Sequence, residues 1–373
     1  MCNRGFTLEL DDAYAEKLLT EMVKIYSPSG EERELALFLR NELSKLGFNV
    51  EFDEVGNLIA EAGCGRPSIL LCSHMDTVPG EIPVIRRGKV LFGRGTVDAK
   101  GPLAALIVAA ARCLKKSIGG KITVLAVVDE ERRSTGMRWF LKKRHGDYDY
   151  AIFGEPSGSR NVTIGYKGRI QLRVKVGTRA GHASAPHLFE NAVMKAYELI
   201  KHLEQSIWRD RKSPLEDTTF CVTKIIGGGL DNTIPSSCEF TADIRIPFHR
   251  KVGDVEEEVF RAIEVFKKLN PKTEVLVNVE DRNEPYLADV NSKLVKAFIE
   301  AIKEVTGVNG KAIKKTGTAD VNDFVHVYNI EAVVYGPGNS KLDHAPNENI
   351  SIPEYLESIK VLEKALEKIT TFK

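Results

Sequence analysis

The chain has 373 residues, more than the roughly 250–300 at which one hydrophobic core stops growing, so we expect two domains. With 43% apolar and 28% charged residues it has the composition of a globular protein, which excludes wholesale disorder. Lysine plus arginine (53) almost equals aspartate plus glutamate (52), and no long block of one sign occurs, so nucleic-acid binding is not expected.

The first part of the chain alternates helical and strand patterns. Apolar residues at helical spacing predict two helices between residues 12 and 46, separated by a break at 27–30. Strands are expected at 48–52, 58–61, 68–72, 122–128 and 150–153, and an apolar helix at 102–115. This alternation is typical of an α/β domain with a partly parallel sheet.

The pattern changes after Gly165, where residues 170–176 alternate as in a half-exposed strand. The elements expected next are a helix at 191–207, strands at 218–226 and 238–246, a helix at 254–268 and a strand at 273–278. This β-α-β-β-α-β order predicts an open-faced sheet with two helices on one side. The helix and strand patterns of the first part of the chain return at 290–306 (helix), 332–335 (strand) and 353–369 (helix). We therefore expect an α/β protein with a mixed-sheet domain (1–165 and 282–373) and an inserted, four-stranded, two-helix α+β domain (166–281).

Acidic residues and histidines follow several predicted core strands directly. They are His74 and Asp76, Glu130 and Glu131, and Glu155. The strand at 332–335 is followed by the glycines Gly336 and Gly338 and then by His344, while Asp98 precedes the apolar helix. Open α/β sheets place their ligand crevices at these carboxyl ends. Carboxylates gathered there repel one another, and a pair of divalent cations would relieve the repulsion.

Two imidazoles and three carboxylates, one of them bridging, suit zinc or another first-row ion. A further carboxylate that binds no metal could take the proton of a water held between the ions and deliver it to a leaving amine. Glu130 and Glu131 could divide these two tasks. Each residue also has a plainer interpretation, such as a turn or helix-cap role for Asp98 or a solvated strand end for the adjacent glutamates.

Six motifs together resemble the co-catalytic zinc family that includes acetylornithine deacetylase, succinyl-diaminopimelate desuccinylase, aminoacylase and glutamate carboxypeptidase. They lie at 73–79, 93–101, 129–131, 154–156 and 181–186 and at His344, in the family's order and over nearly the whole chain. The family's fold is a two-domain metallohydrolase, so the resemblance implies that the larger domain is catalytic and that the inserted domain is a lid that also dimerises.

The resemblance implies roles for the matching residues. One metal ion would be held by His74, Asp98 and Glu155, and a second by Asp98, Glu131 and His344. Asp76 would hydrogen-bond His74 and fix its tautomer. Glu130 would be the general base and acid, and His182 would stabilise the oxyanion, in many relatives from the partner subunit. The substrate would be contacted by Asn232, Arg245, Gly336 and Gly338, with Arg245 pairing with its α-carboxylate.

Segments 165–169 and 315–322 resemble more narrowly the hydrolases that release lysine or ornithine from a small acidic amino-group carrier protein, earlier described as acetyl-lysine deacetylases. The desuccinylases usually carry a Gly-Arg pair where this chain has residues 321–323. We therefore hypothesise that Asp320 or Asp323 receives the cationic side chain of lysine or ornithine. The expected reaction is metal-dependent hydrolysis of the amide between an acyl group (carrier γ-glutamyl or acetyl) and the amine of lysine or ornithine, in lysine or arginine biosynthesis.

Alternatives remain open at this point. The substrate could be N-succinyl-diaminopimelate, N-acetylornithine or a di- or carboxypeptide, or the chain could be a non-catalytic metal- or carrier-binding relative. We expect two divalent ions, Zn²⁺ or else Co²⁺, and a homodimer. Because no signal pattern precedes Asp12 and no apolar stretch is long enough to span a bilayer, we expect a cytoplasmic protein without membrane association. A basic rim formed by Lys167, Arg169, Lys314 and Lys315 could dock the acidic carrier.

Overall fold

The computed structural model describes residues 9–144, 146–208 and 211–372. The chain divides into two compact units. The first consists of Met1–Ile164, Ala288–Ile313 and Asp323–Lys373, and the second of Gly165–Leu287 and Lys314–Asn322. The second unit thus extends beyond the expected boundary at 281 and takes in a short segment that the sequence had assigned to the larger domain.

The first unit is built on a mixed sheet. Its strands run in the order β1-β2-β6-β3-β7-β17-β8. Their bounds are β1 Asn49–Phe52, β2 Leu58–Cys64, β3 Ser68–His74, β6 Gly120–Val127, β7 Tyr150–Phe153, β8 Asn161–Tyr166 and β17 Glu331–Val334. The neighbours β6, β3, β7 and β17 are parallel, and β1, β2 and β8 pair antiparallel with their neighbours. All seven residues of β3 are buried, as expected for a strand covered on both faces.

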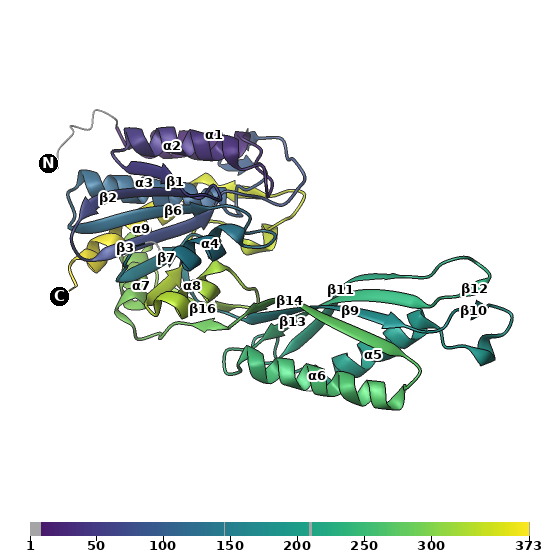
Figure 1. Ribbon diagram of the computed structural model, residues 1–373. Helices are drawn as coiled ribbons and strands as arrows, with labels where there is room; N and C mark the ends of the chain where they lie inside the picture. The colour runs from purple at the N-terminus through teal and green to yellow at the C-terminus, as the bar shows by residue number, and fades with distance from the viewer. Residues whose placement is uncertain (1–8, 145, 209–210, 373) are drawn as a thin grey trace. The chain divides into compact units, whose positions relative to one another are not determined.

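Helices cover this sheet (Figure 1). They are α1 Asp12–Lys24, α2 Arg33–Lys45, α3 Lys100–Lys115, α4 Thr135–Lys143, α7 Lys293–Thr306, α8 Asp320–Tyr328 and α9 Ile352–Thr370. Helix α3 is buried from Lys100 to Ala111, because its alanine- and leucine-rich sequence is apolar around its full circumference. Helices α1 and α9 pack against it, and α9 also packs against α7. Among the described residues, no helix is long and apolar enough to cross a membrane.

The second unit is an antiparallel sheet in the order β11-β13-β9-β14. Its strands are β9 Gly168–Gly177, β11 Thr219–Gly227, β13 Ser237–Ile246 and β14 Glu274–Asn283, and its helices are α5 Ala192–Ile207 and α6 Val252–Leu269. The helices pack against each other and against the sheet, so they cover one face of it (Figure 1). Alternate residues of β9 are buried, in agreement with the alternation in its sequence.

Several short elements escaped the sequence analysis. They are β4 Ile85–Arg87, β5 Val90–Phe92, β10 Gly181–His182, β12 Thr233–Ile234, β15 Tyr286–Leu287, β16 Lys311–Lys315, β18 Asn349–Ser351 and the 3₁₀ turns Pro186–Leu188 and Ser340–Leu342, together with β8, α4 and α8. The predicted fold class is nevertheless confirmed, because the chain is α/β with a large mixed sheet and a β-α-β-β-α-β unit.

Candidate metal centre

Four adjacent strands of the first unit deliver the candidate metal ligands to one edge of the sheet. His74 is the last residue of β3, Glu131 follows β6, Glu155 follows β7, and His344 comes after β17. These strands are neighbours and parallel, so their carboxyl ends meet. Asp98 reaches the same place from the loop before α3, since its carboxylate contacts both histidines.

The carboxylate of Asp98 stands between the two imidazoles. One of its oxygens, Oδ1, lies 3.1 Å from Nε2 of His74, and the other, Oδ2, lies 3.3 Å from Nε2 of His344. Each imidazole also faces a second carboxylate, because Glu155 lies 3.7 Å from Nε2 of His74 and Glu131 lies 2.9 Å from Nε2 of His344. The five side chains thus form two groups that share Asp98.

The charges of this cluster alter the proton affinities of its members. Hydrogen bonds to Asp98 and Glu131 raise the pKa of His344 from 6.5 to about 10. Burial would lower the pKa of His74, but hydrogen bonds to Asp76 and Asp98 raise it well above its usual value. Burial raises the pKa of Glu131, and His344 opposes that shift. Burial would also raise the pKa of Asp98, but its hydrogen bonds with the two imidazoles lower it.

The charges and donor atoms of this cluster indicate what it can bind. Three carboxylates meet at two histidines, and their negative charge favours a positive charge between them, whether a proton on an imidazole or a bound cation. Ligand atoms of His74, Asp98 and Glu131 all lie within 4.8 Å of one another, close enough to hold one ion among them. Imidazole nitrogens and carboxylate oxygens are donors suited to zinc and similar divalent ions. The residues present therefore fit a divalent metal.

Asp76 has more contacts than the sequence suggested. Its side chain is fully buried, with Oδ1 3.4 Å from Nδ1 of His74, while the Asp76 carbonyl oxygen lies closer, at 2.9 Å from that nitrogen. The backbone N–H groups of Glu130 and Glu131 both donate to its carboxylate at 3.0 Å, and the hydroxyl of Ser29 donates at 2.7 Å. Asp76 therefore orients the two glutamates as well as the histidine. Ser29 was missed because the sequence marks it only as part of a helix break.

The second unit holds three further residues to which the resemblance gives roles, His182, Asn232 and Arg245. His182 and Asn232 are close neighbours there, because β10 pairs with β12 and the N–H of Ala183 donates to the Asn232 carbonyl. The backbone N–H of Ser184 donates to Nδ1 of His182 at 3.2 Å, and the Ser184 hydroxyl lies 2.8 Å from the same atom. Since Nδ1 accepts, the neutral ring carries its proton on Nε2.

Arg245 belongs to β13 in the same unit and is held by two neighbours. Asp243 accepts from its Nε at 2.5 Å and from its Nη2 at 3.2 Å, and the Thr318 hydroxyl lies 3.0 Å from Nη1. This leaves guanidinium N–H groups for a further ligand. A cavity of about 350 Å³ adjoins it, lined by Arg245, Pro214, Thr219, Thr316 and Gly317.

Four other residues predicted to contact the substrate are partly or fully buried. Asp320 is only 6% exposed, whereas Asp323 is half-buried. Gly336 and Gly338 are buried, and their N–H groups already donate to the Ser157 hydroxyl and to Glu354. A side chain at Gly336 would collide with the Glu155 carbonyl oxygen, 2.8 Å from the added Cβ. These glycines allow close packing beside a candidate ligand.

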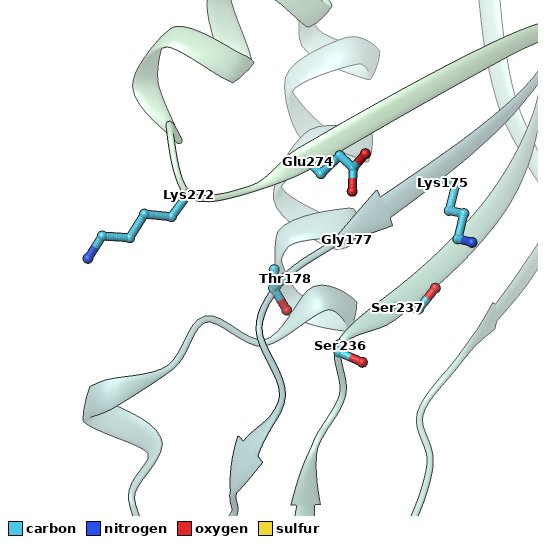
Figure 2. A pocket seen from close by; sticks show the side chains of 7 residues that line it. All are labelled: Lys175, Gly177, Thr178, Ser236, Ser237, Lys272 and Glu274. Carbon is cyan, nitrogen blue, oxygen red and sulfur yellow. The ribbon is translucent and has the colours of Figure 1, made fainter.

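A second cavity in the second unit, of about 370 Å³, contains no predicted site residue. It lies where β9, β13 and β14 meet the loops at their ends, and Lys175, Thr178, Ser237 and Glu274 are among its lining residues (Figure 2). Lys272 also lines it but extends away from the others (Figure 2). The cavity is open to solvent and offers no cluster of metal ligands.

Imidazoles and carboxylates that converge at the carboxyl edge of an α/β sheet are donors suited to a metal centre. The model of peptidase family M20/M25/M40 matches residues 70–368, and this protein belongs to that metal-dependent family. The family recognised from the motifs is therefore confirmed.

Relatives agree with this assignment, and a solved structure shares the fold. A LysW-lysine/LysW-ornithine hydrolase of Sulfurisphaera tokodaii is 34% identical over 97% of this chain and 97% of its own. A relative from Pyrococcus horikoshii, given the same name provisionally, is 37% identical over 95% and 97%. An M20 family metallo-carboxypeptidase from Sulfolobus solfataricus superposes with a TM-score of 0.82 over 97% of this chain and 100% of that one, at 21% identity.

Proposed function

We propose that this protein hydrolyses the amide bond between an acyl group and the amine of lysine or ornithine, with the acyl group provided by a LysW-type carrier protein. The observation that carries the proposal is the placement of Asp98, whose two oxygens face the two histidines. The names of relatives 34–37% identical over nearly the whole chain support the choice of substrate.

The ligand arrangement favours two divalent ions, Zn²⁺ with Co²⁺ as the alternative, over one. His74 and Glu155 lie on one side of Asp98, and His344 and Glu131 lie on the other. When bound, the two ions would polarise the scissile carbonyl and lower the pKa of a water molecule between them. Because the neighbouring carboxylates raise the pKa of both histidines and a metal binds the neutral imidazole, metal binding would release protons.

The residues of the chain would then divide the work. Glu131 faces His344 at 2.9 Å, so the adjacent Glu130 is assigned to proton transfer, taking a proton from water and giving it to the departing amine. Asp76 keeps Glu130 in place through the Glu130 backbone N–H. His182, with its proton on Nε2, would donate to the developing oxyanion. The substrate carboxylate would bind the free N–H groups of Arg245, with Asn232 as a further contact.

For the carrier we propose a docking surface other than the rim predicted from the sequence. That prediction is wrong at Lys167, which is fully buried with its amine bonded to the carbonyls of Pro214 and Asp217. Arg169, another member of the rim, is paired with Asp243 at 2.7 Å. We place the docking surface on α4 and its flanks, directly after Glu131. Its exposed basic residues are Arg132, Arg133, Arg138, Lys142, Lys143 and Arg144.

The homodimer is proposed to form through the second unit. Strand β11 is an edge strand, and large apolar side chains on it, on α5 and on nearby loops are more than half exposed. They are Leu188, Met194, Tyr197, Ile225, Ile226 and Leu230. A patch of this kind next to an open strand edge is typical of a surface covered by a second copy. Light scattering should report a dimer that Ile226→Lys dissociates and that Leu269→Lys, at an exposed leucine on α6, leaves intact.

The experiment for the function is amine release measured by mass spectrometry from zinc- or cobalt-loaded protein. The panel is N-acetyl-lysine, N-acetylornithine, N-succinyl-diaminopimelate, a neutral dipeptide and a carrier ending in γ-glutamyl-lysine. We expect lysyl or ornithyl substrates to be preferred, most strongly on the carrier. Preference for the succinyl compound or the dipeptide would contradict the proposed substrate, and no turnover with two metals bound would favour a non-catalytic relative.

Two variants test the parts of the proposal. Glu130→Gln should keep its metal while kcat falls by about 10²–10⁴-fold. Neutralising Arg138 and Lys142 should lower turnover of the carrier substrate at low salt and leave N-acetyl-lysine turnover unchanged. The matched control neutralises Lys296 and Lys303, two exposed lysines on α7, and should change neither.

A further inference from the structure

A buried ion pair lies beside the metal centre and has no place in the roles described so far. Glu348 and Arg94 are joined by a 3.0 Å contact, and their side chains are 1% and 9% exposed. The sequence analysis missed both, since Glu348 lies in a polar, turn-like segment and Arg94 among glycines. A buried charge pair is costly to desolvate unless further hydrogen bonds satisfy both partners.

The carboxylate of Glu348 is surrounded by donors from a single loop. Its Oε1 accepts from the backbone N–H groups of Val97 at 2.8 Å and Asp98 at 3.1 Å. Its Oε2 accepts from the N–H of Gly95 at 3.1 Å as well as from Arg94. Four donors thus converge on one buried carboxylate, and they fix the backbone of the loop that presents Asp98.

The guanidinium of Arg94 extends the same network to two more loops. Its Nε donates to the carbonyl of Gly80, four residues after Asp76, and its Nη1 donates to the carbonyl of Ala345, next to His344. Glu348 also contacts the loop of His344, because its backbone N–H donates to the carbonyl of Ala345 at 3.3 Å. The pair therefore connects the loops that follow His74, carry Asp98 and contain His344.

We propose that Arg94 and Glu348 are positioning residues that hold Asp98 midway between His74 and His344 and so set the spacing of the two metal positions. This inference rests on the proposed function, because it presumes that Asp98 bridges two ions. Neither residue would bind metal itself. Glu348 has its oxygens occupied by four N–H donors, whereas the oxygens of Asp98 face imidazoles.

Glu348→Gln tests the proposal, because glutamine has nearly the same shape but offers one acceptor oxygen and turns the other position into a donor. Co²⁺ titration followed by visible absorption measures affinity and ligand geometry without any turnover. We expect Co²⁺ affinity to fall by about 10–100-fold, as other supporting residues of metal ligands do when changed, and the absorption per bound ion to change.

The matched control is Glu363→Gln. Glu363 forms a comparable 3.0 Å pair with Arg112 in the same unit, and the two side chains are 10% and 13% exposed. Among the described hydrogen bonds of these two residues, none reaches a metal ligand or the loop that carries one. This variant should lose folding stability while binding Co²⁺ as the original chain does. Equal losses of affinity in both variants would assign the effect to stability and overturn the proposal.

Two further outcomes are kept distinct. Unchanged Co²⁺ affinity and spectrum in Glu348→Gln, measured where circular dichroism shows it folded, would overturn the positioning role and leave the proposed function intact. An unaltered chain that binds fewer than two Co²⁺ ions would instead contradict the proposed function. If Glu348→Gln does not fold, Arg94→Lys takes its place: lysine keeps the charge but cannot reproduce the planar fork, so we expect a loss in the same direction.

Discussion

Replacing Asp76 with alanine should separate the support of the site from its chemistry. The buried carboxylate accepts the N–H groups of Glu130 and Glu131 at 3.0 Å each and the Ser29 hydroxyl at 2.7 Å. Leaving a buried donor without an acceptor costs about 1–3 kcal/mol. The hydroxyl can rotate to another partner, so the two N–H groups dominate, and water entering the space left by the carboxylate offsets part of the loss. We expect a destabilisation of about 3 kcal/mol.

The assay is urea unfolding of protein from which metal ions have been removed with a chelator. The chain has two tryptophans, Trp139 in the first unit and Trp208 in the second. In a Trp208→Phe background, the fluorescence of Trp139 therefore reports the unit that contains Asp76. Ser29→Ala removes one hydrogen bond to the same carboxylate and should cost only about 1 kcal/mol. A loss below about 0.5 kcal/mol for Asp76→Ala, together with unchanged metal affinity, would refute the reasoning.

Two other predictions concern the histidines. Because Asp98 and Glu131 raise the pKa of His344 to about 10, its protonated form stabilises the metal-free fold fully below pH 6.5. That contribution is lost as the pH rises through about 10, and metal affinity should increase over the same window, by up to about tenfold per pH unit. His344→Gln should flatten both curves in thermal unfolding and metal titration. The second prediction concerns His182, whose tautomer is set by the backbone N–H of Ser184 because that group donates to Nδ1. Ser184→Ala keeps this backbone donor, so ¹⁵N NMR spectra should still show the ring proton on Nε2. A ring proton on Nδ1 in this variant would contradict the assignment.

The core strands could be predicted because burial leaves a direct mark on sequence. Strand β7 is Tyr150–Phe153, as expected, and β3, β6 and β17 lie within two residues of their predicted bounds. Each contains an apolar run, and because the four strands are parallel neighbours their carboxyl ends meet at one edge. The grouping of His74, Glu131 and Glu155 could therefore be anticipated without coordinates.

The short elements and the buried lysines could not be predicted in this way. Strand β18 pairs with β5, although more than 250 residues separate them in the chain, and each has only three residues. Lys100 and Lys167 are fully buried, and each amine donates to backbone carbonyls, those of Ile25 and of Pro214 and Asp217. Lysine is almost always exposed, so sequence alone favours the surface. The partners that make burial tolerable come from distant segments.

Acidic residues are the clearest case of what only structure decides. Asp98, Asp76 and Glu348 are all carboxylates at the sheet edge, and their local sequences do not separate their roles. Asp98 faces two imidazoles and so has oxygens directed at the metal positions. Asp76 and Glu348 instead accept backbone N–H groups from the loops that carry the ligands. A carboxylate saturated by N–H donors is stabilised as an anion and is a poor metal ligand, whereas one facing imidazoles becomes a ligand when a cation replaces the protons. The donors around each acid, supplied by other loops, therefore separate the carboxylates suited to bind a metal ion from those that fix the loops of the ligands.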